Sequence, residues 1–375
     1  MRVSCTEKLR DSNGKIIKYK LVGFRGMTKI VNAEELKTAM RNKEVAVSNL
    51  TLTSDNRLVD KKGTTNIPVV FDVNGEIQKE VVNKHNYSEL DTLIDSIIRQ
   101  SLERDIPIKE IPTECGNICY LISKTDIEHM LLIPNSVTHL NKDHTPSSWT
   151  FTKHIKHLRG EIKVIGCTGL IDAAAMFANC EAQKIDMFNT DTSKVKNMKA
   201  MFLDCNAQDI NLARLNTQNV ENMFAMFMRC RAHTIDFSNF KTSKVTTMYA
   251  MFFCCHTTRI KLNSFDTHNV TEMGSLFNGC VTNELDISSF NTSKVTRMPD
   301  MFANSKIPVI NLSSFDMTNI DDMSGIFYAC TARGIILPNS KLKTCANKGM
   351  MFTKCNAKLK TNNLVFLKEY HLNRK

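Results

Sequence analysis

Hydrophobic positions repeat with a fixed period through the second half of the chain. A phenylalanine recurs every 25 residues without insertion or deletion, and a cysteine follows three positions later in every copy except one, where Ser305 stands. In a solenoid each unit buries its apolar face only against its neighbours, so a period of this size predicts a stack of similar coils. The recurring phenylalanines are Phe177, Phe202, Phe227, Phe252, Phe277, Phe302, Phe327 and Phe352.

Within one unit, the pattern predicts a strand followed by a helix. Ile210 and Leu212 flank a polar residue, and this period of two is typical of a strand with one buried face. Across 195–205 the apolar residues fall within an arc of about 120° when each residue turns by about 100°, as in an amphipathic helix. Thr and Ser precede this run, as they do at helix starts. The apolar residues of the run are Val195, Met198, Met201, Phe202 and Cys205.

The spacing of these two elements predicts curvature. Strands of successive units stack about 4.8 Å apart, whereas helices need roughly 8–10 Å between their axes. The strands are therefore expected on a tight inner side and the helices outside. We expect an α/β solenoid, a curved leucine-rich-repeat-like stack of 25-residue strand-turn-helix units, with a small α+β module at the N-terminus.

The repeat resembles that of a known family. The segments "IDFSNFKTSKVTTMYAMFFCC" and "LDISSFNTSKVTRMPDMFANS" are similar to the BspA-like leucine-rich repeat, of the bacterial surface protein A and treponemal type, and the resemblance covers about 160–356. It implies a leucine-rich-repeat fold. Members of that family are often secreted or surface-attached and bind proteins, which implies a protein partner. The chain departs from them at its N-terminus, "MRVSCTEKLRDSNGK", where charges stand in place of the apolar core of an export signal.

Outside the repeats, the pattern predicts two helices, and it divides the whole chain into four regions. Asn32 and Glu35 are arranged as a capping box at the start of a helix over 32–43, and an amphipathic helix is expected over 86–104. The N-terminal region loosely resembles small modules of bacterial and phage proteins. The expected regions are a β-β-α-β module at 1–62, an acidic α+β connector at 63–150, the solenoid at 151–356 and a basic C-terminal cap at 357–375.

The net charge of +11 is concentrated at the two ends of the chain. Residues 1–62 carry 14 Lys and Arg against 7 Asp and Glu, and residues 341–375 carry 9 against 1, whereas residues 151–340 carry 19 against 17. A groove that follows a polyanion needs positive charge along its length, which the repeats lack. No run of about 18 apolar residues is present. With the charged N-terminus, this predicts a cytoplasmic protein, of the producer or of a cell into which it is delivered, without membrane contact.

The sequence carries no familiar catalytic motif. It holds no P-loop, HExxH, nucleophile elbow or dinucleotide fingerprint, so we expect no enzyme activity, no catalytic residue and no cofactor. The cysteine column lacks the two-residue spacing of thiolate clusters, and we interpret it as core rather than as a metal site. The weakest alternative is a zinc enzyme, which would draw on Cys115, Cys119, His144, His154, His157 and Cys167.

Polar residues that flank each buried strand position predict a recognition strip. Solenoids bind partners on their concave surfaces, and this strip mixes both signs of charge, with a basic island at Arg259 and Lys261 between acidic flanks. Mixed charge suits a protein surface better than a phosphate backbone. The candidate partner-binding residues are Lys184, Asp186, Asp209, Asn211, Asp236, Arg259, Lys261, Glu284, Asp286 and Asn311.

A second column alternates lysine with asparagine at each predicted helix start. "TSKV" recurs at 192, 242 and 292, which indicates duplication of a 50-residue pair and explains the lysines by ancestry. A lysine in every second coil still has the spacing to touch phosphates. The candidate polyanion contacts are Lys194, Lys244 and Lys294 in the repeats, with Lys341 and Lys343 near the C-terminus.

Two functions therefore compete. The favoured hypothesis is a non-enzymatic scaffold that recognises a protein through the concave face of the solenoid. The alternative is a protein that binds nucleic acid or a nucleoprotein through its basic ends, for example a phage or mobile-element inhibitor of a bacterial CRISPR-type nuclease.

Overall fold

The computed structural model describes residues 3–10, 16–23, 28–31, 50–52, 57–60, 66–68, 87–141, 150–339, 342 and 346–373. The chain forms two compact units, 1–86 and 87–375. The first unit has two antiparallel sheets, one of β1 (Val3–Arg10), β2 (Ile16–Gly23) and β3 (Thr28–Val31), the other of β4 (Leu50–Leu52), β5 (Arg57–Asp60) and β6 (Asn66–Pro68). The helix expected over 32–43 lies outside the described residues.

The second unit begins with α2 (Tyr87–Glu103), which confirms the amphipathic helix expected over 86–104. Its apolar stripe is covered by the sheet, since Leu90 and Ile94 are buried in a small cluster with Leu132 and Ile165. Asp91 also accepts a hydrogen bond from the backbone N–H of Asn135, at 2.9 Å. This helix therefore packs on the first strands of the sheet and not on the later coils.

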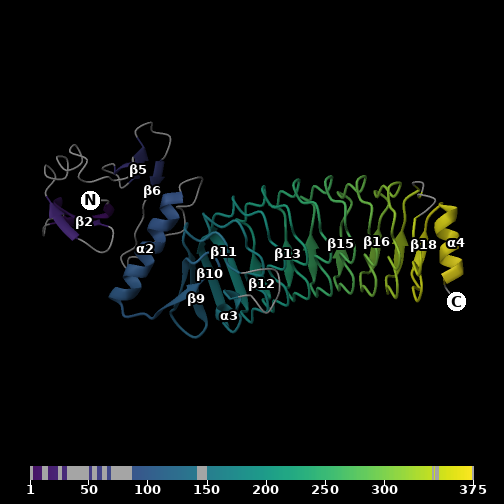
Figure 1. Ribbon diagram of the computed structural model, residues 1–375, viewed down its shortest axis with the longest axis horizontal. Coiled ribbons are helices and arrows are strands. Elements are labelled where there is room, and N and C mark those ends of the chain that lie inside the picture. The colour runs from purple at the N-terminus through teal and green to yellow at the C-terminus, as the bar shows by residue number, and fades with distance from the viewer. Residues whose placement is uncertain are drawn as a thin grey trace. The chain divides into compact units, whose positions relative to one another are not determined.

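A nine-stranded sheet carries the chain into the repeats (Figure 1). It starts antiparallel and becomes parallel from its third strand onward, and it crosses the boundary that we expected at residue 150. Its strands are β7 (Ile108–Pro112), β8 (Ile118–Ser123), β9 (Glu128–Ile133), β10 (Glu161–Gly166), β11 (Lys184–Thr190), β12 (Asp209–Asn211), β13 (Thr234–Asp236), β14 (Arg259–Lys261) and β15 (Glu284–Leu285). A second parallel sheet follows, of β16 (Val309–Asn311), β17 (Gly334–Ile336) and β18 (Lys358–Lys360).

The repeats form a solenoid, as the period predicted. We number its eight coils by their phenylalanines, from the first, with Phe177, to the eighth, with Phe352, and call each set of equivalent side chains a column. The phenylalanine rings are buried and stack on one another, with all seven successive centroid distances between 4.9 and 6.1 Å. The cysteines Cys180, Cys205, Cys230, Cys255, Cys280, Cys330 and Cys355 are buried and free, and Ser305 fills the remaining rung.

The predicted helix in each unit is wrong. Over 195–205 the side chains that we expected to be buried are buried, but the backbone does not form a helix. The N–H groups of Met201, Leu203 and Cys205 donate to the carbonyl three residues earlier, and the N–H groups between them donate to the next coil. The N–H groups of Ala200, Phe202 and Asp204 donate to backbone oxygens of the next coil at 2.8–2.9 Å. Ala200 and Asp204 have φ of 53°, which lies in the left-handed region. With this backbone conformation, every second N–H group of the segment points toward the next coil of the stack.

This geometry removes the reason to expect curvature. Both the strand segment and the turn segment of each coil are hydrogen-bonded to the next coil, so both advance by the spacing of paired backbones, about 4.8 Å. No helix layer with its larger spacing is present in the described coils. The mismatch that would place the strands on a concave side is therefore absent.

Buried threonines also tie the coils together rather than capping helices. Thr192 Oγ1 donates to the carbonyl of Asn216 at 3.0 Å and accepts from the N–H of the same residue at 2.8 Å. Thr217, Thr242, Thr267 and Thr292 repeat this donated bond, each one coil further along. Each hydroxyl thus satisfies two backbone groups that would otherwise be buried without partners.

Short helices cover both ends of the stack. At the first coil, Thr152 of α3 (Thr152–Ile155) donates its hydroxyl to the carbonyl of Ala175 at 2.8 Å. At the other end, Tyr370 of α4 (Leu364–Asn373) packs edge-on against Phe352 at 5.4 Å and donates to the carbonyl of Ala357 at 2.7 Å. These contacts cover apolar and polar groups that an open end would expose.

The phenylalanine column predicts a large mutational effect. Phe252 lies between Phe227 and Phe277, so Phe252→Ala removes two stacking contacts and leaves a cavity. We expect a loss of about 3–5 kcal/mol in the free energy of unfolding, measured by urea denaturation of the full chain. The half-buried Phe253 is the matched control, and Phe253→Ala should cost clearly less. Equal losses for the two variants would contradict a stacked core.

Candidate functional site

The predicted recognition strip lies on β11–β16, but its charged groups bind one another. Lys261 Nζ lies 2.6 Å from a carboxylate oxygen of Asp236, and Arg259 Nε lies 2.7 Å from Glu284. Lys184 is paired with Glu161 at 2.9 Å. The basic island is therefore neutralised by acidic groups of the adjacent coils, although each exposed pair contributes only about 0–1 kcal/mol.

In several coils the Asp or Asn at the end of the strand segment has a structural task that the sequence analysis missed. Asp286 Oδ1 accepts hydrogen bonds from the N–H of Ser288 at 3.0 Å and from its hydroxyl at 2.7 Å. Asp236, Asn211 and Asn311 accept in the same way from the N–H two residues later. Such Asx turns fix the bend that follows the strand. The role of the strip in partner binding stays a prediction.

The lysine–asparagine column is also bonded along the stack. Asn219 Nδ2 donates to the carbonyl of Ser193 at 2.7 Å, and its Oδ1 accepts from Lys244 Nζ at 2.6 Å. Asn269 repeats both bonds, to Ser243 and from Lys294. These two lysines are held by neutral amides, so their positive charge is not compensated by those bonds. Lys194 has a partner of its own, and Lys341 and Lys343 lie outside the described residues.

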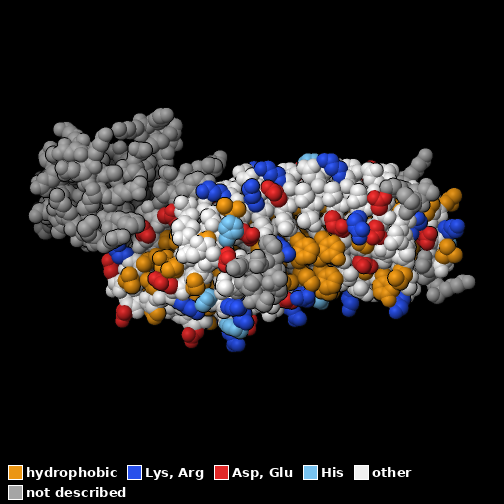
Figure 2. Space-filling view, in the orientation of Figure 1, with side chains coloured by type: hydrophobic (Ala, Val, Ile, Leu, Met, Phe, Trp, Pro, Cys, Tyr) orange, Lys and Arg blue, Asp and Glu red, His pale blue; other side chains and the backbone are white. Residues whose placement is uncertain are grey.

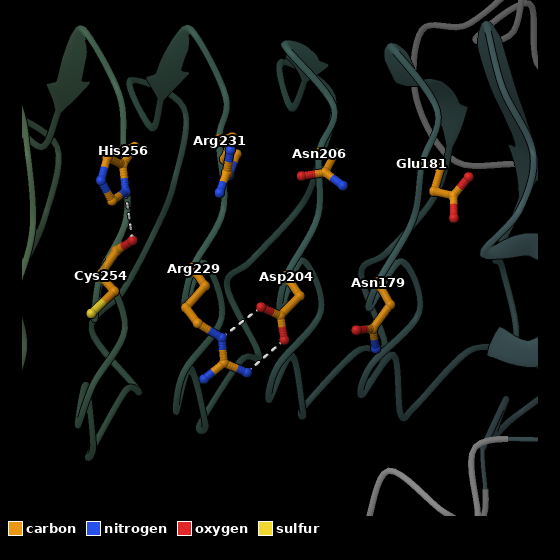
Figure 3. A pocket seen from close by; sticks show the side chains of 8 residues that line it. All are labelled: Asn179, Glu181, Asp204, Asn206, Arg229, Arg231, Cys254 and His256. Carbon is orange, nitrogen blue, oxygen red and sulfur yellow. Dashed lines mark hydrogen bonds and ion pairs between the residues drawn. The ribbon is translucent and has the colours of Figure 1, made fainter.

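An open groove of about 540 Å³ crosses the first four coils where the turn segment ends. It is formed by two columns that flank the buried cysteines, one residue before and one residue after each of them. Figure 3 shows these side chains in two rows, one pair from each coil. They are Asn179, Glu181, Asp204, Asn206, Arg229, Arg231, Cys254 and His256.

Charge changes sign along this groove. Glu181 stands at its first coil, near His157 at 3.4 Å and Arg159 at 3.9 Å. Arg229 Nε and Nη2 each donate to a different oxygen of Asp204 at 2.5 Å, and this carboxylate raises the pKa of the guanidinium. A bidentate pair holds both side chains in one orientation. The acidic groups therefore lie in the first two coils and the two arginines in the third, beside His256 in the fourth.

A patch of half-buried apolar side chains borders the groove. Its members are Leu203, Phe224, Met228, Tyr249 and Phe253, which we call the aromatic patch. The rings of Phe224 and Tyr249 stack at 5.6 Å, and Lys199 Nζ lies 5.1 Å from the centroid of Phe224. Figure 2 shows hydrophobic side chains gathered midway along the coils, with further groups toward both ends of the same face.

The patch and the groove occupy neighbouring columns. In the later coils, Lys354 stands at the groove position and Tyr328 at the patch position, and Lys354 Nζ lies 5.7 Å from the Tyr328 ring centroid. Asn304 Nδ2 likewise donates to Asn278 Oδ1 at 3.3 Å across the same two columns. One surface thus combines aromatic, methionine and arginine side chains over the second to fourth coils.

The fold does not require these side chains. The position of Phe224 and Tyr249 is taken in the next coils by Gly274, Pro299 and Ser324, and the coils keep the same backbone bonds. Gly274 itself makes room for the patch, since a Cβ there would lie 2.8 Å from the Tyr249 ring. The later coils make the same backbone bonds without an aromatic residue at this position. Folding alone therefore does not account for Phe224 and Tyr249.

Cys119 of the zinc alternative lies near Cys115 and Cys167, whose charges act on its thiol. Cys119 and Cys167 are buried, and no group of three metal-ligating side chains is present among the described residues, which do not include His144. Cys115 is partly exposed; partial burial alone would raise its pKa, but hydrogen bonds from Thr113 and from backbone groups lower it to about 5. In the part of the chain that the structure describes, no helix has the length and apolar character to cross a membrane.

The sequence analysis missed both the groove and the patch because it assigned their columns to the outside of a helix. A signal was present nonetheless. At the position of Phe224 and Tyr249 the later repeats change to Gly, Pro and Ser, while the buried positions around it stay apolar. Variation of this kind separates outward-facing residues from core residues.

The stacked coils, with one continuous core and outward-facing columns, show that this is a solenoid repeat protein. The chain belongs to the family described as "Mycoplasma protein of unknown function, DUF285", whose model matches residues 147–264 and 250–364, together more than half of the 375 residues. No curated protein and no solved structure matches the chain. The family match agrees with a repeat region of the kind predicted, and it does not itself name the BspA-like type.

The Asx turns predict acid sensitivity with a definite sign. The Ser288 hydroxyl and N–H hold the pKa of Asp286 below its usual range, so the carboxylate stabilises the fold above the unfolded carboxyl pKa of about 3.9. This contribution is lost as the pH falls below about 4, through the lowered pKa. Asp286→Asn should therefore lose less stability between pH 6 and pH 3 than the wild type, as urea midpoints will measure.

The equivalent position in the next coil is an asparagine, so the reverse substitution, which adds a carboxylate, can be made there. Asn311 accepts from the N–H of Ser313 at 3.1 Å, so Asn311→Asp places a carboxylate in the same turn. We expect a steeper loss of stability on acidification than in the wild type. Identical pH profiles for the two variants would show that these turns do not couple to folding.

Proposed function

We propose that this protein is a non-enzymatic scaffold that binds a protein partner through the aromatic patch and the groove beside it. The observation that carries the proposal is the confinement of half-buried Phe224, Tyr249 and Phe253 to adjacent coils of a fold that does not need them. Aromatic residues, Met and Arg are the side chains enriched in the buried centres of protein interfaces.

The structure favours this patch over the strand strip that the sequence analysis proposed. Arg259 and Lys261 already have carboxylate partners, and the strip lacks the concave shape that a helix layer would impose. A partner on the strip would have to displace these ion pairs and would meet Asx turns committed to the fold. The aromatic patch offers apolar area whose burial is favourable by about 25 cal/mol per Å².

The BspA-like resemblance supports a protein partner, since such repeats often bind proteins. A cytoplasmic location, of the producer or of a cell into which the protein is delivered, stays part of the proposal. The test in cells is fractionation of the producer, with the tagged chain expected in the same fraction as its partner.

The patch predicts a defined loss of binding. We expect Tyr249→Ser with Phe253→Ser to lower capture of the partner from producer-cell extract at least tenfold, because hot-spot residues contribute about 2 kcal/mol or more each. Capture is quantified by mass spectrometry after nuclease treatment, and thermal melting confirms that the variant folds.

The chain contains its own control. Tyr328 stands at the position of Phe253 three coils further on, outside the patch, and is half-buried as well. Tyr328→Ser should leave capture unchanged. If it reduces capture as much as the double variant, or if the double variant captures normally, the patch is not the binding surface.

The lysine–asparagine column favours the second candidate function, binding of a nucleic acid or nucleoprotein such as a nuclease complex. Lys244 and Lys294 project from alternate coils with uncompensated charge, about 10 Å apart. If these lysines contact phosphates, the affinity for single-stranded or duplex DNA should fall steeply as salt rises from about 0.05 to 0.2 M, and Lys244→Gln with Lys294→Gln should make the slope shallower. A flat salt profile excludes this candidate.

A further inference from the structure

We propose that the basic half of the groove binds an acidic segment of a protein partner, with a carboxylate held by Arg231 and an N–H or O–H group of the same segment held by His256. This inference rests on the proposed function, because it names the chemistry of the partner that lies across the patch and the groove. Neither the family description nor the repeat pattern assigns a ligand to this site.

Arg231 is an exposed guanidinium without a hydrogen-bond or ion-pair partner among the residues that the structure describes. Its backbone is fixed, since its N–H donates to the carbonyl of Cys205 at 3.0 Å. Guanidinium groups match the planar geometry of carboxylates through paired hydrogen bonds. Its neighbour Arg229 differs, because Asp204 occupies two of the donors of Arg229.

His256 supplies a second group in the next coil. Its Nδ1 lies 2.9 Å from the carbonyl oxygen of Cys254, and a carbonyl only accepts, so Nδ1 carries a proton. This bond fixes the tautomer and leaves Nε2 as a hydrogen-bond acceptor, which can receive an N–H or O–H group of the segment. Figure 3 shows His256 and Arg231 in the same row of the groove, on adjacent coils.

The length of the groove fits a short extended peptide. It crosses four coils, which are three steps of about 4.8 Å, or roughly 14 Å in all. An extended chain advances about 3.4 Å per residue, so about four residues cover this distance. A segment with its acidic residue at the Arg231 end can place a neutral or basic residue near Glu181.

The acidic half of the groove disfavours a nucleic acid at this site. A nucleic acid strand carries a negative charge at every nucleotide and would bring one of them close to Glu181. A protein segment has no such repeat of charge, and electrostatic complementarity with mixed signs is typical of protein interfaces. The sign change along the groove therefore favours an acidic peptide and also gives it a direction.

The experiment uses an array of immobilised random hexapeptides probed with the full-length chain at roughly 0.15 M salt. We expect the wild type to retain peptides that contain Asp or Glu, and Arg231→Glu to bind them at least tenfold less. The matched control is Lys306→Glu, which makes the same change of charge in the same column three coils further on and should bind within twofold of the wild type.

Two outcomes of this experiment overturn the inference. If Lys306→Glu loses as much binding as Arg231→Glu, the retained peptides respond to overall charge and not to the groove. If a single-stranded oligonucleotide displaces the peptides and binds more tightly, the ligand of the groove is a nucleic acid.

Capture from producer-cell extract separates this inference from the proposed function. If Arg231→Glu captures the partner as well as the wild type while Tyr249→Ser with Phe253→Ser does not, the scaffold stands and the acidic segment is wrong. If the wild type captures no protein, the proposed function fails, and the peptide array still reports on the groove itself.

Discussion

The structure depends on pairing every coil with the next through backbone hydrogen bonds on both its strand side and its turn side. A buried N–H or C=O without a partner costs about 1–3 kcal/mol, so each coil must present its groups at the same heights as its neighbours. The bonds from Ala200, Phe202 and Asp204 to the next coil meet this condition. The constant phenylalanine interval of 25 residues keeps these groups matched along the eight coils. The strands of the last two coils still pair at a different interval, since Gly334 is the partner of Lys358, 24 residues later.

This constraint divides the residues of a coil into two kinds. Inward positions, such as those of Phe252 and Thr242, are committed to columns that stabilise the whole stack. Outward positions that take no part in the Asx turns or in the lysine–asparagine column vary more freely, because the backbone bonds do not depend on their side chains. Function is therefore expected where an outward column departs from its neighbours, and the change from Tyr249 to Gly274 is such a place.

The buried residues could be predicted from the sequence, whereas the local conformation could not. Met198, Met201, Phe202 and Cys205 have the spacing of a helical stripe, and the structure buries all of them through consecutive tight turns instead. What decides between the two is the left-handed backbone at Ala200 and Asp204, and a hydrophobic pattern carries no information on φ. Asn and Asp at the position of Asp204 in several coils were a weak indication, since they tolerate this conformation better than most residues.

The candidate site was harder to predict for the same reason. The charges of the strand strip were located correctly, but their pairing with adjacent coils depends on distances that the sequence does not contain. The groove required knowing that residues on either side of each buried cysteine point outward together, as Arg229 and Arg231 do. A helix would have placed two residues so spaced on different sides, so the wrong element concealed the site.

Asn219 and Asn269 each bond to the coil before and the coil after, and this limits how the number of coils can change by recombination of the gene. Asn219 spans its two neighbours because a serine carbonyl lies before it and a lysine follows it, and Asn269 repeats this arrangement. Recombination that copies two coils preserves every bridge. Copying one coil would set two lysines side by side or leave an asparagine without its lysine, so tandem expansion and contraction should favour steps of two coils over single ones.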